Sequence, residues 1–158
     1  MSAQLLFVCT GNTCRSPLAE AMARRLAAAR GLDVTVSSAG TSAWEGATAS
    51  DGSMLVGLER DLDLSSHRAR VLTRELVDGA SVILAMSPHH AAQVLALGGS
   101  GKVHLLRDYA AGDAAGRAVQ DPFGAGLDAY RVMADELDTE LPRVLDRLAH
   151  EWSSGERP

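Results

Sequence analysis

Within the first thirty residues, a short apolar run is followed directly by a loop of small polar residues and then by a helical pattern. Leu5 to Val8 form a continuous apolar run, as in strands that are buried on both faces. Cys9 to Pro17 follow, with Gly11 and other small residues that favour a tight turn. From Leu18 to Ala27, Leu, Met and Ala recur at helical spacing, and Gly31 marks the expected helix end. A buried strand that leads through a loop into a helix is typical of a parallel α/β sheet.

The rest of the chain repeats this alternation of strand and helix. Further strands are expected at Val34 to Ser38, Ser81 to Ala85 and Lys102 to Leu106. Helices are expected at Ser50 to Arg60, Pro88 to Leu97 and Asp128 to His150, the last kinked or split by Pro142. The Gly- and Ala-rich stretch Ala110 to Val119 predicts a mobile loop. The pattern predicts one α/β domain over residues 1–158, a four-stranded parallel sheet with helices on both faces and a tight loop after the first strand.

Composition narrows the possible partners and compartment. A chain of 158 residues with 46% hydrophobic residues fits one compact core. The net charge of -5 argues against a nucleic-acid partner, whose phosphates favour basic surfaces. We find no signal segment and no uninterrupted apolar run long enough to span a membrane, so we expect a cytoplasmic protein without a membrane partner. Its two cysteines are too few for a disulfide framework.

The loop after the first strand has the chemistry of a phosphate site. Its backbone N–H groups and the helix that follows can cradle phosphate oxygens, and Arg15 adds a planar fork that binds two of them. Cys9 lies at the carboxyl end of the strand, where ligands bind in open parallel sheets. A thiol beside a helix N-terminus and an arginine ionises readily, so Cys9 is the predicted nucleophile. The expected phosphate-binding residues are Thr10, Gly11, Asn12, Thr13, Cys14, Arg15 and Ser16.

Cys9, Arg15 and Cys14 could also be structural residues or metal ligands. A lone cysteine at a strand end is usually a small buried residue, but a dry core would not hold the guanidinium of Arg15. A zinc site at Cys9 and Cys14 is disfavoured because no second ligand pair has suitable spacing, so we expect no metal and no cofactor. Hydrolysis also needs a proton donor, and Asp121, after the flexible stretch and before Pro122, is the candidate. On its own, Asp121 would be taken for an ordinary turn residue.

The segment Val8-Cys-Thr-Gly-Asn-Thr-Cys-Arg-Ser-Pro17, followed by Asp121-Pro122 in the last third, resembles the low-molecular-weight protein-tyrosine phosphatase family. Ser38-Ala39-Gly40 and Ser65-Ser66-His67 extend the likeness over nearly the whole chain. The resemblance implies a phosphocysteine at Cys9, transition-state binding by Arg15 and acid-base action by Asp121. It also implies that Asn12, Ser16, Ser38 and His67 support the loop, and that Cys14 can pair reversibly with Cys9 on oxidation, although simple packing would equally account for Cys14 and His67.

The substrate implied by this resemblance is a phosphorylated protein, and its phosphorylated residue is left open between two types. Trp44 and Phe123 resemble the walls of a phosphotyrosine pocket, although either could be ordinary packing. Thr13 and Gly124 resemble the bacterial protein-arginine phosphatases of the family, whereas tyrosine-directed members usually have a bulky aliphatic and a second aromatic residue there. These features favour phosphoarginine over phosphotyrosine. A monomer or weak dimer is expected.

Three rival functions share this fold or loop. An arsenate reductase needs further cysteines, and none follows Cys14, which leaves only a reductase that uses external thiols. A phosphocarrier would hold a phosphocysteine without hydrolysing it, and would not need Arg15 or Asp121. A pure binding module is the third alternative.

Overall fold

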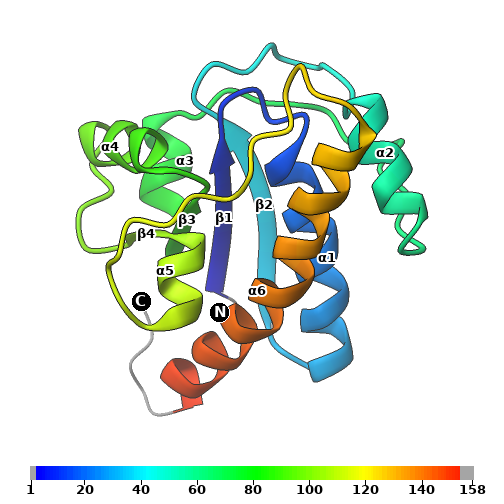
Figure 1. Ribbon diagram of the computed structural model, residues 1–158. Helices are drawn as coiled ribbons and strands as arrows, with labels where there is room; N and C mark the ends of the chain where they lie inside the picture. The colour runs from blue at the N-terminus through cyan, green and yellow to red at the C-terminus, as the bar shows by residue number, and fades with distance from the viewer. Residues whose placement is uncertain (1–2, 154–158) are drawn as a thin grey trace.

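The computed structural model describes residues 3–153, whose four strands form one parallel sheet in the order β2-β1-β3-β4 (Figure 1). The strands are β1 (Ala3–Cys9), β2 (Val34–Gly40), β3 (Val82–Ala85) and β4 (Val103–Leu105). All four strands predicted from the sequence are present, and the predicted single α/β domain with a four-stranded parallel sheet is confirmed.

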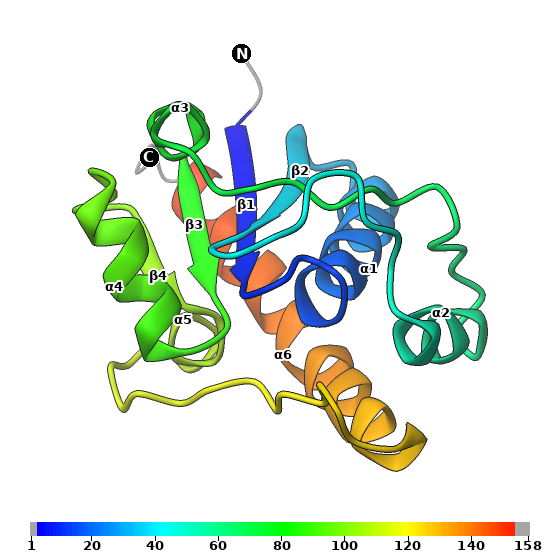
Figure 2. The same ribbon diagram turned by 90° about the horizontal axis from the view of Figure 1, so that it is seen from above.

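Helices cover both faces of this sheet (Figure 2). One face carries α1 (Arg15–Arg30), α2 (Asp51–Leu58), α5 (Leu106–Ala111) and α6 (Leu127–Ser153). The other face carries α3 (Arg74–Gly79) and α4 (Pro88–Ala96). None of these helices, within residues 3–153, has the length and apolarity needed to cross a lipid bilayer.

The apolar run in β1 is continuous because its side chains serve two cores. Leu5 and Phe7 pack into the core beneath α1 and α6, whereas Leu6 and Val8 pack into the core beneath α3 and α4. All four side chains are buried, which is expected when successive residues of a strand point to opposite faces of a covered sheet.

The strand order places a switch point beside β1. The chain passes from β1 to β2 on one side and then returns to β3 on the other side of β1. Ligands of doubly wound sheets bind at such points, beyond the carboxyl ends of the strands. Gly40, at the end of β2, is part of this geometry, because a Cβ atom there would lie 2.4 Å from the carbonyl oxygen of Thr10. A glycine is therefore required for the end of β2 to pack against the loop after β1.

Three details differ from the expectations. The short helices α3 and α5 were not predicted, and α5 takes Leu106, Ala110 and Ala111 from the strand and loop that were expected there. The last helix is not split at Pro142 and runs continuously from Leu127 to Ser153. Its apolar stripe lies buried against α1 and α5, and this packing offsets the backbone hydrogen bond that proline cannot make.

Candidate active site

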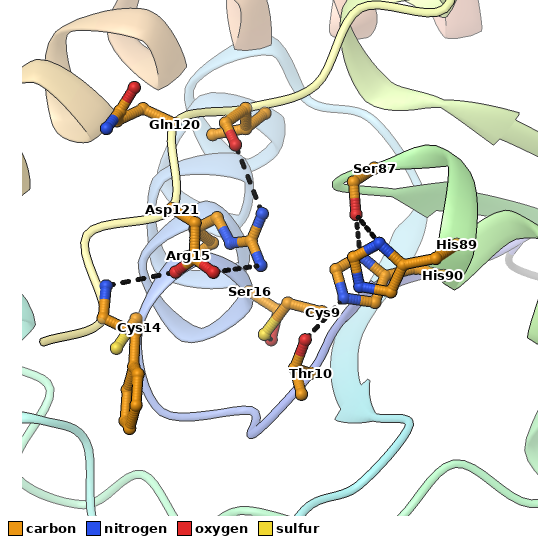
Figure 3. A network of polar contacts seen from close by, with 12 residues as sticks. Cys9, Thr10, Cys14, Arg15, Ser16, Ser87, His89, His90, Gln120 and Asp121 are labelled. Atoms are coloured by element: carbon orange, nitrogen blue, oxygen red, sulfur yellow. Dashed lines mark hydrogen bonds and ion pairs between the residues drawn. The ribbon is translucent and has the colours of Figure 1, made fainter.

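A cavity of about 270 Å³ opens at the carboxyl end of β1. It brings together three residues that are far apart in the chain, Cys9, Arg15 and Asp121 (Figure 3). The lining residues are Cys9, Thr10, Gly11, Thr13, Cys14, Arg15, Ser42, Asp121 and Phe123. A larger recess of about 500 Å³ behind β2 is lined by no cysteine or histidine, so the predicted nucleophile belongs to the smaller cavity.

Asn12 fixes the shape of the loop between β1 and α1. It adopts a left-handed conformation (φ 56°), which asparagine tolerates better than most residues. Its side-chain oxygen accepts the N–H of Arg70 at 3.0 Å, and its carbonyl oxygen lies 2.7 Å from Nε2 of His67. The structure thus brings His67 to the loop, at the backbone rather than at the sulfur.

A chain of hydrogen bonds leads from the partly buried carboxylate of Glu20 to the sulfur of Cys9. Ser38 donates its hydroxyl to Oε1 of Glu20 at 2.7 Å, and its oxygen accepts an N–H from Asn12 at 2.9 Å. The second side-chain N–H of Asn12 is donated to Ser16 Oγ at 2.8 Å, and Ser16 Oγ lies 2.9 Å from the sulfur of Cys9.

The number of donors and acceptors on each side chain sets the direction of these hydrogen bonds. A carboxylate only accepts hydrogen bonds, so the Ser38 hydroxyl donates to Glu20, and the Ser38 oxygen is left to accept from one N–H of Asn12 while the other N–H is donated to Ser16. Because Ser16 Oγ accepts this N–H, its own hydroxyl hydrogen is free to be donated to the sulfur of Cys9. Glu20 was not identified from the sequence, where it looks like an ordinary residue on the exposed side of a helix.

Arg15 is buried although it is charged, with a side chain only 4% exposed. Its guanidinium donates to the carbonyl oxygen of Val119 at 3.2 Å and lies 3.6 Å from a carboxylate oxygen of Asp121, whose side chain is 56% exposed. Arg15 is the first residue of α1, so it lies where the unpaired N–H groups of the helix end can bind an anion. The arginine therefore joins the loop to the segment that carries Asp121.

The predicted pocket walls are only partly brought to the cavity. Thr13 and Phe123 line it, and so does Ser42, which was not predicted. Trp44 is not among the lining residues, and its side chain is 84% exposed to solvent. A role for Trp44 as a pocket wall stays a prediction.

Cys14 also lines the cavity but contacts the opposite side of the loop. Its sulfur lies 3.4 Å from Ser50 Oγ and 3.5 Å from the hydroxyl of Tyr130. Burial and the adjacent Cys14 raise the pKa of Tyr130. Cys9 and Cys14 are both free cysteines, so their reversible pairing remains a prediction.

A buried histidine that was not predicted from the sequence completes the site. His90, at the start of α4, has its Nε2 atom 2.7 Å from the hydroxyl of Thr10 and its Nδ1 atom 2.7 Å from the hydroxyl of Ser87. Burial, together with the nearby His89 and Arg15, lowers the pKa of His90 to about 4. A neutral imidazole therefore supports the loop from the side of β3 (Figure 3). The sequence around His90 shows only that it follows Pro88 at the start of a helix, which does not indicate a contact with the loop.

The neutral state of His90 predicts a pH-dependent stability. The unfolded chain takes up a proton near the ordinary pKa of 6.5, whereas the folded protein does so only near 4. The free energy of unfolding should therefore fall as the pH falls through this window, by about 3 kcal/mol from this group. Urea unfolding across the window, with wild type and His90→Gln compared, measures the effect. An equal pH dependence in both proteins would contradict it.

The comparisons with known proteins agree with this geometry. The family model for low molecular weight phosphotyrosine protein phosphatase matches residues 4–154. A protein-arginine-phosphatase of Bacillus subtilis is 37% identical over 146 residues, which cover 91% of this chain and 95% of the relative. The low molecular weight protein-tyrosine-phosphatase PtpB of Staphylococcus haemolyticus is 33% identical over 137 residues, which cover 85% and 91% of the two chains.

Solved structures give the same result for the fold. The crystal structure of a YwlE mutant from Bacillus subtilis superimposes with a TM-score of 0.88 at 36% identity, covering 94% of this chain and 99% of the other. The YwlE arginine phosphatase in the form of a cysteine-to-serine mutant, with a phosphorylated active site serine, gives a TM-score of 0.85 at 36% identity, with 92% and 95% covered. The chain described here belongs to the low molecular weight phosphotyrosine protein phosphatase family.

Proposed function

We propose that this phosphatase hydrolyses phosphoarginine in proteins through a phosphocysteine intermediate at Cys9. The observation that carries the chemistry is the shared cavity, in which the sulfur of Cys9, the guanidinium of Arg15 and the carboxylate of Asp121 face the same space. A nucleophile, a cation for the phosphoryl oxygens and a proton donor are the groups that this reaction needs.

The first step transfers the phosphoryl group to sulfur. The thiolate of Cys9 attacks phosphorus, the bond from phosphorus to the departing nitrogen or oxygen breaks, and Asp121 in its acid form gives that atom a proton. Arg15 and the loop N–H groups bind the equatorial oxygens, whose charge must be stabilised in the transition state.

The second step returns the enzyme to its starting state. Asp121, now a carboxylate, takes a proton from water, the resulting hydroxide equivalent bonds to phosphorus, and the bond from phosphorus to sulfur breaks. The sulfur leaves as a thiolate, which the hydroxyl of Ser16, 2.9 Å away, stabilises by donating a hydrogen bond. Inorganic phosphate is released and no cofactor is required.

Three observations support phosphoarginine as the substrate. Two of the relatives reported above bear the name of arginine phosphatase. Thr13 lines the cavity with a hydroxyl that can bind a polar guanidinium, where a branched aliphatic side chain would fill the space. Gly124 has φ 76°, a backbone conformation in which a second aromatic residue would be strained, so the aromatic wall contributed by this segment is Phe123.

Phosphotyrosine is the second candidate. A relative named as a protein-tyrosine-phosphatase is 33% identical to this chain, and the exposed rings of Trp44 and Phe123 could enclose an aromatic substrate. An arsenate reductase that relies on external thiols is a more distant alternative, because Cys9 and Cys14 are the only cysteines.

The substrate proposal is tested by replacing Thr13 with isoleucine. We expect Thr13→Ile to lower kcat/KM for phosphoarginine peptides by about 10- to 100-fold relative to phosphotyrosine peptides, because the hydroxyl is lost and the cavity narrows. Steady-state kinetics on paired peptides of one sequence measure the ratio. Thr13→Ser, which keeps the hydroxyl, is the matched control. If Thr13→Ile leaves the preference unchanged, the argument from Thr13 fails.

A further inference from the structure

The segment that leads to Asp121 is held by side chains from three helices, α1, α5 and α6. It has no regular secondary structure after α5, yet its backbone is tied down at successive points. The N–H of Val119 is donated to the carbonyl oxygen of Met86 at 2.8 Å, and its carbonyl oxygen accepts from Arg15. The backbone of residues 116–121, which we call the acid segment, is thus held in place by hydrogen bonds.

The anchor nearest to the proposed acid is Glu136 of α6. Its Oε1 atom accepts the backbone N–H of Gln120, the residue before Asp121, at 2.7 Å. Its Oε2 atom is paired with Arg107 of α5 at 3.2 Å, and the same guanidinium nitrogen of Arg107 donates to the carbonyl oxygen of Ala118. The Glu136 side chain is 22% exposed, so solvent screens these contacts only in part.

A second carboxylate fixes the start of the same segment. Asp108 of α5 is buried and accepts the backbone N–H groups of Gly116 at 2.8 Å and Arg117 at 3.1 Å. Each of its oxygens therefore holds one amide. Together, Asp108 and Glu136 hold three backbone N–H groups of the acid segment.

Asp121 itself has little to hold it in place. Its carboxylate lies 3.6 Å from Arg15, beyond the length of a strong hydrogen bond, and within residues 3–153 it accepts only the local N–H of Phe123 at 3.1 Å. Its position over the cavity thus depends on the backbone that precedes it. A displacement of about 1 Å in a catalytic group can cost about 100-fold in rate.

We infer that Glu136 is a positioning residue for proton donation: by holding the N–H of Gln120 it keeps Asp121 over the leaving atom of the substrate. The inference rests on the proposed role of Asp121 as the acid. Glu136 acts on the transfer step through Asp121 alone. Loss of the Glu136 carboxylate should therefore lower the rate of phosphoryl transfer more for a leaving group that needs a proton than for one that does not.

The experiment compares two substrates that differ in the leaving group. Phenyl phosphate releases a poor leaving group that needs the acid, whereas para-nitrophenyl phosphate releases a good one. The measured quantity is kcat/KM, because it reports transfer to Cys9 and not the hydrolysis step that both substrates share. Glu136→Ala should lower kcat/KM for phenyl phosphate about tenfold more than for para-nitrophenyl phosphate, in the same direction as Asp121→Asn.

Matched variants separate positioning from stability. Glu136→Gln keeps an oxygen that can accept the N–H of Gln120 and should recover most of the difference between the substrates. Asp146→Asn alters a carboxylate of the same helix that pairs with Arg30, and should leave both substrates unaffected. Gln120→Pro deletes the donor itself, so adding Glu136→Ala to it should cause no further selective loss, whereas Gln120→Ala keeps the donor and should behave as wild type.

The outcomes distinguish this inference from the proposed function. A selective loss in Asp121→Asn without one in Glu136→Ala and Gln120→Pro overturns the positioning role alone. Equal losses for both substrates in Asp121→Asn overturn the acid role and the inference with it. Selective losses in all three, with recovery in Glu136→Gln, support both.

Discussion

Cys9→Ser is expected to lower turnover of para-nitrophenyl phosphate by about four orders of magnitude or more while phosphate and vanadate still bind. A serine hydroxyl is far less ionised than a thiol in the same place, and it is a much poorer leaving group in the second step. The loop N–H groups and Arg15 are unchanged by the substitution, so the anion site survives. Steady-state rates and calorimetric titration with phosphate measure the two effects separately.

The matched control is Cys14→Ser, which alters the other cysteine that lines the cavity. We expect it to retain most of the activity, because the substitution keeps the backbone N–H of residue 14 and the Cys14 thiol has no part in either proposed step. Persistent turnover by Cys9→Ser would refute the nucleophile.

Arg15→Lys is expected to lower kcat/KM by about 10³-fold, although the charge is kept. The planar guanidinium of Arg15 reaches the carbonyl oxygen of Val119, the carboxylate of Asp121 and the cavity at once. An ammonium group is a single point charge and cannot make these contacts together. Kinetics on para-nitrophenyl phosphate, with circular dichroism to verify the fold, measure the loss.

Arg25→Lys is the control for the substitution type, since Arg25 lies on the same helix and donates to the carbonyl oxygen of Arg60 away from the cavity. Its kinetics should match wild type. Wild-type kcat/KM in Arg15→Lys would show that the fork geometry of residue 15 is not needed.

The sequence predicted the sheet well because each strand is a short run of apolar residues buried on both faces. The run from Leu5 to Val8 is too short for a buried helix and ends at a tight polar loop, so a buried strand was the natural prediction. The helices α3 and α5 were missed because six residues hold less than two turns, too few for a periodic pattern. Of the kink or split expected at Pro142, the split does not occur, because the packing of a 27-residue amphipathic helix outweighs one lost hydrogen bond; the kink stays a prediction.

The residues of the candidate site could be predicted from the sequence where they lie close together in one short motif. Cys9 and Arg15 lie six positions apart and could be paired from the sequence, whereas Glu20, Ser42, His90 and Glu136 meet the site only through folding. An acidic residue on a helix or a histidine after a proline carries no local signal of its partner. Trp44, suggested by resemblance, is exposed and is not among the residues that line the cavity, so its role as a pocket wall stays a prediction.

The most direct test of the phosphocysteine is to trap it. In Asp121→Asn the second step lacks its base, so mixing this variant with para-nitrophenyl phosphate and stopping the reaction by denaturation in the first turnovers should leave phosphate on the enzyme. Peptide mass spectrometry should then locate it on Cys9. Phosphate on another residue, such as Ser16 or Cys14, or hydrolysis that proceeds at a substantial rate with Cys9 never modified, would contradict the account.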